Sequence, residues 1–201
     1  MIKITNEDNM ELMARYPDNH FELAIVDPPY GIDVTKMNMG GRKRNKDDKD
    51  KDWDLGVPNK EYFDELFRVS KNQIIWGGNY FDLPPSQYFA IWDKGETMYG
   101  RSFAECEYAW VRSGGTRIYK KNPNQLNRIH PTQKHLKLYE WLLMNYAKEG
   151  DKILDTHLGS GSIALACHNL NYDLTACELD KEYYEASLKR LKEHQSQLTI
   201  F

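Results

Sequence analysis

Short apolar segments alternate with helical segments along most of the chain, and this alternation constrains the fold more than any other feature. Parallel strands need a long crossover between them, usually a helix, so the pattern predicts an α/β domain with a largely parallel, doubly wound sheet. The expected strands are 1–5, 21–26, 73–76, 88–92, 107–111, 152–156 and 173–179, and the expected helices are 9–17, 61–69, 136–147, the segment after 159–161, and 181–198.

The 201 residues are enough for one domain, expected to span 1–201. Residues 33–60 contain few apolar positions, and 42–54 mix six Lys or Arg with five Asp, which predicts a mobile loop. No apolar run approaches the ~20 residues that span a bilayer, and the N-terminus has no secretory pattern. Three widely spaced cysteines predict a reducing, cytoplasmic environment and no structural metal.

Charge is distributed unevenly along the chain. The net charge is −3, yet 112–137 contains seven basic residues and no acidic one, so the remainder carries −10. A segment this one-sided suits a polyanion such as DNA, whose binding should then weaken steeply with salt. A solvated surface loop explains the same composition, and charge alone leaves both interpretations open.

A glycine-rich turn follows the strand expected at 152–156. The sequence Asp-Thr-His-Leu-Gly-Ser-Gly-Ser begins at Asp155, and its glycines permit close approach of a ligand to the N-terminus of the next helix. Glu178 ends the following strand, where a carboxylate accepts both hydroxyls of a ribose. These residues predict a nucleoside-bearing cofactor. An NAD site and a simple tight turn remain alternatives.

The strand 21–26 runs directly into Asp27-Pro28-Pro29-Tyr30-Gly31. This places a carboxylate at the carboxyl end of a sheet strand, where open α/β sheets bind ligands. The prolines remove local N–H partners, so the nearby carbonyls face an incoming group. Acceptors of this kind can hold the two N–H groups of an exocyclic amine, while a Tyr ring stacks on an extruded base. A Pro-Pro turn after a core strand is the structural alternative.

A third polar segment precedes the helix 136–147. It reads Asn-Arg-Ile-His-Pro-Thr-Gln-Lys from Asn127 to Lys134. Donors near a helix start suit a carboxylate ligand, and a basic helix N-terminus without a ligand is the alternative.

The three segments, in this order, resemble the amino-group DNA methyltransferases that use S-adenosylmethionine, which carry Asp-Pro-Pro-Tyr, His-Pro-Thr-Gln-Lys-Pro and Gly-x-Gly motifs. Placing the catalytic motif first is typical of the permuted β class. The resemblance implies a seven-stranded, circularly permuted, Rossmann-like methyltransferase sheet. It also implies transfer of a methyl group to adenine N6 of a flipped base, since Asp27 and Tyr30 resemble the residues at these motif positions in the adenine-N6 enzymes. Two positions depart from the family pattern, His135 for a proline and His157 in a usually apolar position.

The resemblance assigns roles residue by residue. It places the target base on Asp27–Tyr30, the four residues called the tetrad below. The methionine part of the cofactor would lie beside the glycine turn, its ribose at Glu178 and its carboxylate near Lys134. Asp8 is expected near the cofactor adenine. The predicted catalytic residues are Asp27, Pro28, Pro29 and Tyr30; the predicted cofactor-binding residues are Asp8, His130, Thr132, Gln133, Lys134, Asp155, His157, Gly159, Ser160, Gly161, Ser162 and Glu178.

Little of the chain is left for reading a DNA sequence. The loop 33–60 and the basic segment 112–129 are the expected DNA contacts, so we expect short or relaxed recognition, or contacts borrowed from a second subunit such as a homodimer partner. Alternatives are a cytosine-N4 methyltransferase, an inactive DNA- or cofactor-binding partner subunit, and an NAD dehydrogenase. The predicted DNA-binding residues are Arg42, Lys43, Arg44, Arg112, Arg117, Lys120, Lys121 and Arg128.

Overall fold

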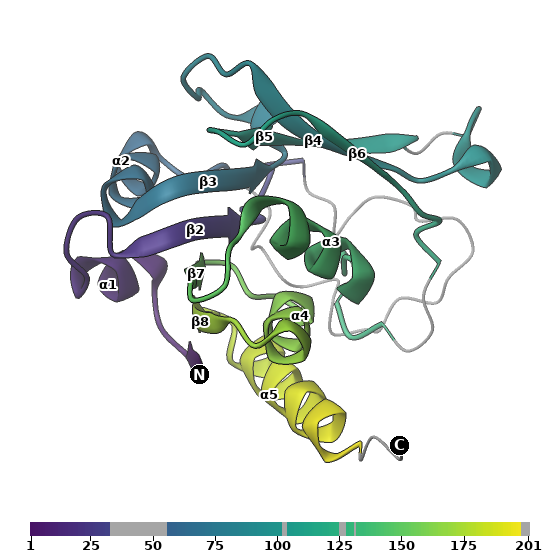
Figure 1. Ribbon diagram of the computed structural model, residues 1–201. Coiled ribbons are helices and arrows are strands. Elements are labelled where there is room, and N and C mark those ends of the chain that lie inside the picture. The colour runs from purple at the N-terminus through teal and green to yellow at the C-terminus, as the bar shows by residue number, and fades with distance from the viewer. Residues whose placement is uncertain (33–55, 102–103, 125–127, 131, 198–201) are drawn as a thin grey trace.

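The computed structural model describes residues 1–32, 56–101, 104–124, 128–130 and 132–197, and these form one sheet with helices on both faces (Figure 1). The sheet has eight strands in the order β1-β8-β7-β2-β3-β5-β4-β6. The strands are β1 (Ile2–Thr5), β2 (Phe21–Val26), β3 (Ser70–Trp76), β4 (Tyr88–Asp93), β5 (Cys106–Val111), β6 (Arg117–Lys120), β7 (Lys152–Asp155) and β8 (Asp173–Cys177).

The helices form two layers. Buried side chains of α1 and α2 pack with one face of the sheet, and those of α3, α4 and α5 pack with the other. Figure 1 shows α1 and α2 together beside β2 and β3, with α3 and α4 on the opposite side. The helices are α1 (Asn9–Ala14), α2 (Lys60–Val69), α3 (Leu136–Tyr146), α4 (Ser162–Leu170) and α5 (Lys181–Ser196), with short 3-10 turns η2 (Gly78–Tyr80) and η3 (Glu96–Met98).

The strand directions place several chain turns at one edge. Five neighbouring strands of the sheet, β1, β8, β7, β2 and β3, are mutually parallel. Their carboxyl ends therefore lie at the same edge of the sheet. Strand β5 is antiparallel to both β3 and β4, whereas β6 is parallel to β4. The prediction of a mostly parallel α/β sheet is therefore confirmed, with β5 as the reversed strand. The edge that collects the carboxyl ends is where such sheets bind ligands.

The predicted number of seven strands is wrong for this sheet. The extra strand is β6, which lies in the segment 112–129 and pairs with β4 from Ala90 to Asp93. Its four residues are Arg-Ile-Tyr-Lys, and Ile118 is 68% exposed. An edge strand with little buried surface lacks the apolar pattern by which strands are detected, so backbone pairing was the only signal.

Side-chain caps fix where several helices begin. Asp8 accepts a hydrogen bond from the Met10 N–H at 2.8 Å, and Asn59 accepts one from the Tyr62 N–H at 3.0 Å. Helix α1 ends at Ala14, earlier than the predicted limit at Pro17. Of the predicted loop 33–60, residues 33–55 lie outside the described chain, and Lys60 already belongs to α2. Within the described residues, no helix has the length and apolarity to cross a membrane.

Candidate active-site cleft

A cleft of about 660 Å³ opens where the carboxyl ends of β2, β7 and β8 meet. This volume is within the usual range for sites that bind small molecules. Eleven of the sixteen predicted catalytic and cofactor residues line it: Asp27, Pro29, Asp8, His130, Thr132, Gln133, Lys134, His157, Gly159, Ser160 and Glu178. The other five, which are Pro28, Tyr30, Asp155, Gly161 and Ser162, lie outside its lining. Three segments distant in sequence therefore meet at one cleft.

The Asp27 carboxylate is held by two side chains. The hydroxyl of Tyr30 donates to Asp27 Oδ1 at 2.6 Å, and the ammonium of Lys134 forms an ion pair with Asp27 Oδ2. Lys134 Nζ lies 3.4 Å from the Tyr30 hydroxyl. Burial raises the pKa of Tyr30 well above its ordinary value, and the Asp27 charge adds to this, so the phenol stays protonated as a donor. The structure thus directs Lys134, expected near a cofactor carboxylate, toward Asp27.

The ring of Tyr30 occupies a narrow slot. It stacks on Tyr80 with ring centres 5.0 Å apart and an interplanar angle of 11°. Gly77 borders it so closely that a Cβ there would lie 2.2 Å from the Tyr30 ring. Gly77 also has φ +69°, a conformation that favours glycine. No motif in the sequence marks Gly77 or Tyr80, so these supports of the tetrad were not predicted.

Lys134 has a second acidic partner that the motifs did not reveal. Glu107 Oε2 lies 3.3 Å from Lys134 Nζ, and Glu107 Oε1 lies 2.9 Å from Lys94 Nζ. Burial opposes the charge on Glu107, but the two lysines outweigh it and hold its pKa below the ordinary value. Likewise, burial disfavours the Lys134 charge, but Asp27 and Glu107 outweigh it and raise its pKa. A connected set of charges therefore backs the tetrad.

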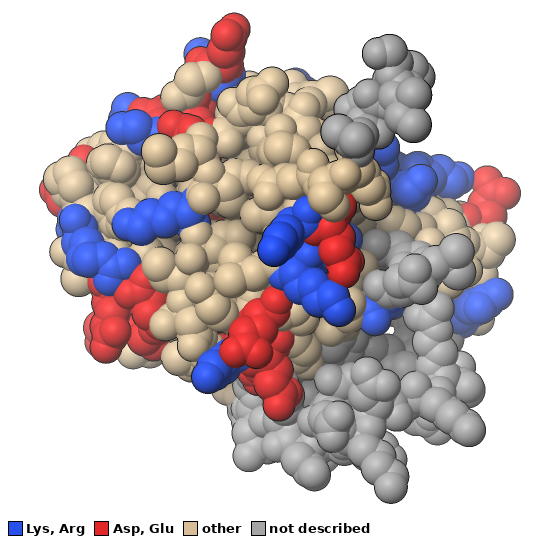
Figure 2. Space-filling view, turned by 90° about the horizontal axis from the view of Figure 1, so that it is seen from below, with Lys and Arg blue, Asp and Glu red and all other residues tan. Residues whose placement is uncertain are grey.

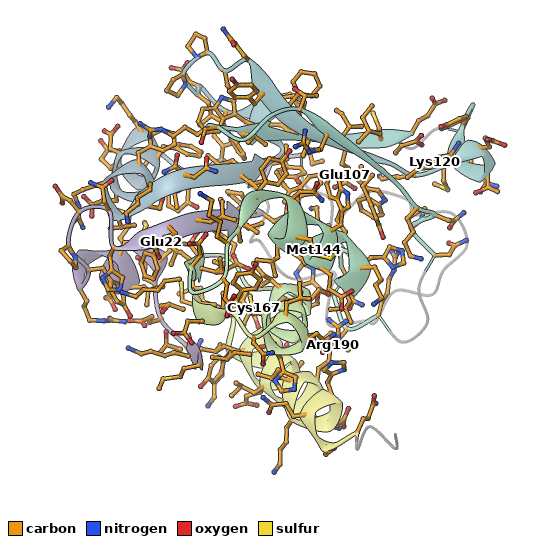
Figure 3. The ribbon with its side chains drawn as sticks, in the orientation of Figure 1. Glu22, Glu107, Lys120, Met144, Cys167 and Arg190 are labelled. Carbon is orange, nitrogen blue, oxygen red and sulfur yellow. The ribbon has the colours of Figure 1, made fainter. Side chains whose placement is uncertain are left out.

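The glycine turn forms the opposite wall of the cleft. Gly161 is the N-cap of α4 with φ +71°, and a Cβ there would lie 3.0 Å from Ser187 Cβ on α5. Arg190, also on α5, donates to the Ser160 carbonyl at 2.7 Å and to Ser162 Oγ at 2.9 Å. Figure 3 labels Arg190 beside α4. The closing helix therefore fixes the turn from behind, which the motif alone did not indicate.

Two predicted acids occupy different positions relative to the cleft. Glu178 lines it and accepts hydrogen bonds from the N–H groups of Gly159 at 2.7 Å and Asp180 at 2.9 Å. Asp155 is buried behind it and accepts from the His157 N–H at 2.9 Å. Burial raises the pKa of Asp155 to about 8. Asp155 was predicted to bind the cofactor, but it supports the turn from beneath and does not line the cleft.

His157 acts in the structure as a neutral ring. Burial lowers its pKa to about 4, so the imidazole is uncharged at neutral pH. Its Nδ1 lies 3.0 Å from Thr156 Oγ1, its Nε2 lies 3.2 Å from Asn9 Nδ2, and its ring meets Tyr62 edge-on at 5.3 Å. A neutral, packed histidine can fill the position that is usually apolar in the resembled family.

The segment before α3 is held by its own side chains. The N–H of Thr132 donates to His130 Nδ1 at 3.3 Å, and the N–H of Ile129 donates to Gln133 Oε1 at 3.0 Å. His130 also meets the ring of Tyr183, on α5, with centres 4.4 Å apart. His135, the departure from the family pattern, is the N-cap residue of α3, and its Nε2 lies 2.7 Å from the Asn122 carbonyl. The entry into α3 is thereby tied to the segment after β6.

The predicted DNA-binding residues do not gather on one face. The Arg112 guanidinium lies 5.8 Å from the ring centre of Phe67 on α2, whereas Arg117 donates to Asn145 on α3 at 3.3 Å. Lys120 pairs with Glu96 at 3.0 Å. On the face shown in Figure 2, basic and acidic side chains are interspersed. Arg42, Lys43 and Arg44 lie outside the described residues. The basic side chains of the segment 112–137 are thus divided between the two helical layers.

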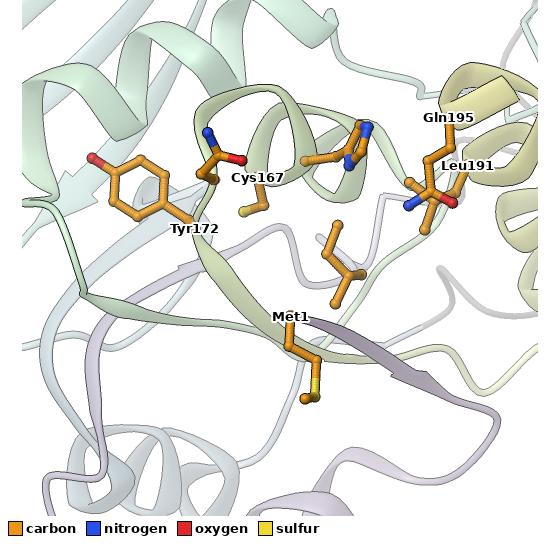
Figure 4. Close-up of a pocket in the computed structure, with 8 residues that line it drawn as sticks. Met1, Cys167, Tyr172, Leu191 and Gln195 are labelled. Atoms are coloured by element: carbon orange, nitrogen blue, oxygen red, sulfur yellow. The ribbon is translucent and has the colours of Figure 1, made fainter. Parts of the chain in front are cut away.

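A second cavity of about 480 Å³ lies between the start of β1, α4 and α5 (Figure 4). Met1, Cys167, Tyr172, Leu191 and Gln195 are among the residues that line it. Burial raises the pKa of the Cys167 thiol, so it is not an activated nucleophile. None of the predicted site residues lines this cavity, which separates it from the cleft.

The comparison with known families decides how the cleft is classified. A family model described as DNA methylase matches residues 86–189, just over half of the chain. The match includes the segments His130–Lys134 and Asp155–Ser162. The chain belongs to the DNA methylase family. The resemblance inferred from the motifs is therefore confirmed for the amino-group DNA methyltransferases as a group.

Two curated relatives match this chain over part of their length. It is 38% identical over 68 residues to the type II methyltransferase M.HpaI of Haemophilus parainfluenzae, covering 34% of this chain and 22% of that protein. It is 38% identical over 63 residues to the type II methyltransferase M2.DpnII of Streptococcus pneumoniae, covering 31% of this chain and 24% of that protein. The aligned parts therefore span less than a quarter of either relative.

A solved structure matches this chain over nearly its whole length. The crystal structure of the M1.HpyAVI–SAM complex aligns with a TM-score of 0.63 and 22% identity, covering 95% of this chain and 99% of that chain. At this identity the likeness establishes the fold. The expectation of a Rossmann-like methyltransferase fold is confirmed, with eight strands in a mixed sheet.

Proposed function

We propose that this chain is a DNA methyltransferase that transfers a methyl group from S-adenosylmethionine to N6 of an adenine extruded from the duplex. The observation that carries the proposal is the meeting of Asp27 with the glycine turn and Glu178 in one cleft. A carboxylate after β2 and a nucleoside-type site after β7 and β8 are the two parts that such a transfer requires. Family membership supports the same reaction class.

The residues of the cleft fit S-adenosylmethionine. The left-handed Gly159 and Gly161 keep the turn free of side chains at the start of α4, and Glu178 offers carboxylate oxygens suited to ribose hydroxyls. The uncharged ring of His157 suits the apolar part of such a ligand. When bound, this cofactor supplies a methyl group on a sulfonium sulfur, which leaves as a neutral thioether.

On the other wall, the tetrad would hold the target amine. Asp27 accepts a hydrogen bond from the amine and stabilises the positive charge that develops on nitrogen as the N–C bond forms. The excess proton on nitrogen then passes to water. Holding the amine in line with the methyl group lowers the entropic part of the barrier. No covalent intermediate with the protein is required.

Adenine is the preferred target on the basis of the tetrad. Aspartate at its first position is similar to the adenine-N6 enzymes, whereas serine is commoner in the cytosine-N4 enzymes. Cytosine N4 is the second candidate because the matching family model, named N6_N4_Mtase, joins both kinds. Both amines have N–H groups from which Asp27 can accept a hydrogen bond, so the same cleft chemistry serves either base.

We also infer that the chain is circularly permuted. The tetrad follows β2, whereas the glycine turn follows β7, so the catalytic part precedes the cofactor part along the chain. In the sheet, β2 lies next to β7, which brings the two parts together despite their separation in sequence. This order is the one expected for the β class.

The proposal assigns DNA contacts to the carboxyl edge of the sheet. Lys120 pairs in register with Asp93 at the end of β4, and Lys121 follows it, so this end of β6 lies at the same edge as the cleft. Arg128 lies within the segment before α3 and donates to the Pro123 carbonyl, while Arg112 contacts α2. We therefore place Lys120 and Lys121 ahead of Arg112 as phosphate contacts.

The deciding experiment is a transfer assay. The pure protein is incubated with methyl-labelled S-adenosylmethionine and unmethylated DNA, and the modified nucleoside is identified by mass spectrometry. N6-methyladenine is the expected product. N4-methylcytosine would move the target to the second candidate. Binding of S-adenosylmethionine without any modified nucleoside would contradict the proposal and favour a partner subunit without activity.

A further inference from the structure

Glu107 pairs with two lysines, Lys134 behind the tetrad and Lys94 on its other side. It lies on β5, and its two carboxylate oxygens point to different partners, Lys134 at 3.3 Å and Lys94 at 2.9 Å. Figure 3 labels it between the strands β4 to β6 and helix α3. Because Lys94 holds one oxygen, Glu107 keeps its position whether or not Lys134 remains on Asp27.

The proposed transfer creates a competition at Asp27. One carboxylate oxygen accepts from Tyr30 at 2.6 Å, and the other is paired with the Lys134 ammonium. Each carboxylate oxygen has two lone pairs, so a target amine that donates to Asp27 Oδ2 shares this oxygen with Lys134 and weakens the ion pair. Lysine has donors and no acceptor, so it cannot itself receive the amine N–H.

Weakening the Lys134–Asp27 pair leaves the lysine charge in need of a second partner. Its side chain is 3% exposed, and a buried ammonium without a partner is strongly unfavourable. Among the described residues that contact Lys134, Glu107 is the second carboxylate. The gap of 3.3 Å can close with a small movement of the flexible lysine chain.

We propose that Glu107 is a positioning residue that receives the Lys134 ammonium when Asp27 turns to the target amine. This inference rests on the proposed function. In this arrangement Lys134 pairs mainly with Asp27 before the base enters, and with Glu107 while the amine is held. Glu107 does not touch the base; it acts through Lys134, and its effect belongs to the transfer step.

The test is the Glu107→Gln variant, compared with wild type in the transfer assay and by calorimetric binding of S-adenosylmethionine. The substituted amide keeps the shape of the side chain and lacks its charge, so Lys134 stays on Asp27. We expect kcat to fall about tenfold, as for loss of a coupled pair, while Kd for S-adenosylmethionine changes by less than about twofold. Glu140→Gln is the control, since Glu140 is likewise an acid paired with a lysine, Lys137, and lies on α3 outside the cleft.

A double-mutant cycle separates positioning from a structural role. If Glu107 acts through Lys134, adding Glu107→Gln to Lys134→Met changes kcat by less than about twofold. Losses that multiply would overturn the inference, as would an unchanged kcat in Glu107→Gln alone. Should Glu107→Gln fail to fold by circular dichroism, Glu107→Asp replaces it, and its charge is expected to retain more activity than Glu107→Ala. Equal activity in those two variants would overturn the inference.

The inference and the proposed function fail in different ways. If wild type and Glu140→Gln transfer no methyl group to DNA, the proposed function is wrong. If both transfer it and Glu107→Gln matches them, the function holds and the role of Glu107 is wrong. The two results come from the same set of proteins in one assay.

Discussion

The two walls of the cleft hold their polar groups by different means. On the wall after β2, Asp27 is held by side chains, the Tyr30 hydroxyl and the Lys134 ammonium. On the wall after β7 and β8, Glu178 is held by backbone N–H groups of Gly159 and Asp180. Side-chain donors can move away from a carboxylate, whereas backbone donors in a fixed turn cannot. The first wall is suited to exchange partners during a reaction, and the second to present a fixed surface to a ligand.

The largest effect is expected at the exchangeable wall. Asp27→Ala removes the acceptor for the target amine, and we expect kcat to fall by about 10²–10³-fold, the usual cost of removing one group that stabilises transition-state charge. Binding of S-adenosylmethionine should stay close to wild type, because Glu178 and the glycine turn are unchanged. Kinetics of methyl transfer and calorimetry measure the two quantities. Substantial residual activity would show that Asp27 is not the acceptor.

The fixed wall should respond in affinity. Glu178→Gln retains one acceptor oxygen and loses the charge, so Kd for S-adenosylmethionine should rise about tenfold, as for loss of a hydrogen bond to a charged group. The kcat at saturating cofactor should change little. Glu185→Gln, an exposed position on α5, is the control and should leave Kd unchanged. An effect of Glu178→Gln on kcat alone would break the division between the two walls.

The slot for Tyr30 gives a smaller, structural test of the first wall. At Gly77 an added Cβ would meet the Tyr30 ring at 2.2 Å, whereas at Gly100, with a similar φ of +71°, nothing lies within 4 Å. Both variants to Ala place a side chain at a similar positive φ, so their difference reports mainly the contact with Tyr30. We expect Gly77→Ala to be less stable than Gly100→Ala by about 1–3 kcal/mol in urea unfolding. Equal stabilities would mean that the Tyr30 ring moves freely.

The difference between contiguous motifs and long-range contacts explains how much of the fold and of the site could be predicted from the sequence. The motifs are contiguous, so strand, turn and helix patterns predicted the carboxyl edge and eleven of the residues that line the cleft. The strand β2 was predicted at its observed limits, 21–26. Glu107, Gly77 and Arg190 have no local signal, because each acts through a residue distant in the chain. Edge strand β6 was missed because it buries little apolar surface.

The last test is a pH dependence at Asp155, which is buried beneath the cleft. Burial raises the pKa of its carboxyl to about 8, and the charges of Asp27 and Glu178 add to this. In the unfolded chain its pKa is near the ordinary value of 3.8. Between these values the folded protein holds a proton that the unfolded chain has lost, so the stability that Asp155 provides falls as pH rises from about 4 to about 8.

Asp155→Asn removes this titration and keeps an acceptor for the His157 N–H. The melting temperature of the variant minus that of wild type should therefore increase between pH 5 and pH 8. Asp82→Asn, an exposed acid, serves as the control and should give a difference that is flat with pH. The same scan in an Asp27→Asn background measures how strongly the two walls are coupled, because removing the Asp27 charge brings the pKa of Asp155 closer to its ordinary value. A pH dependence that does not weaken in that background would mean that burial and Glu178 set it without Asp27, and that the walls are electrostatically independent.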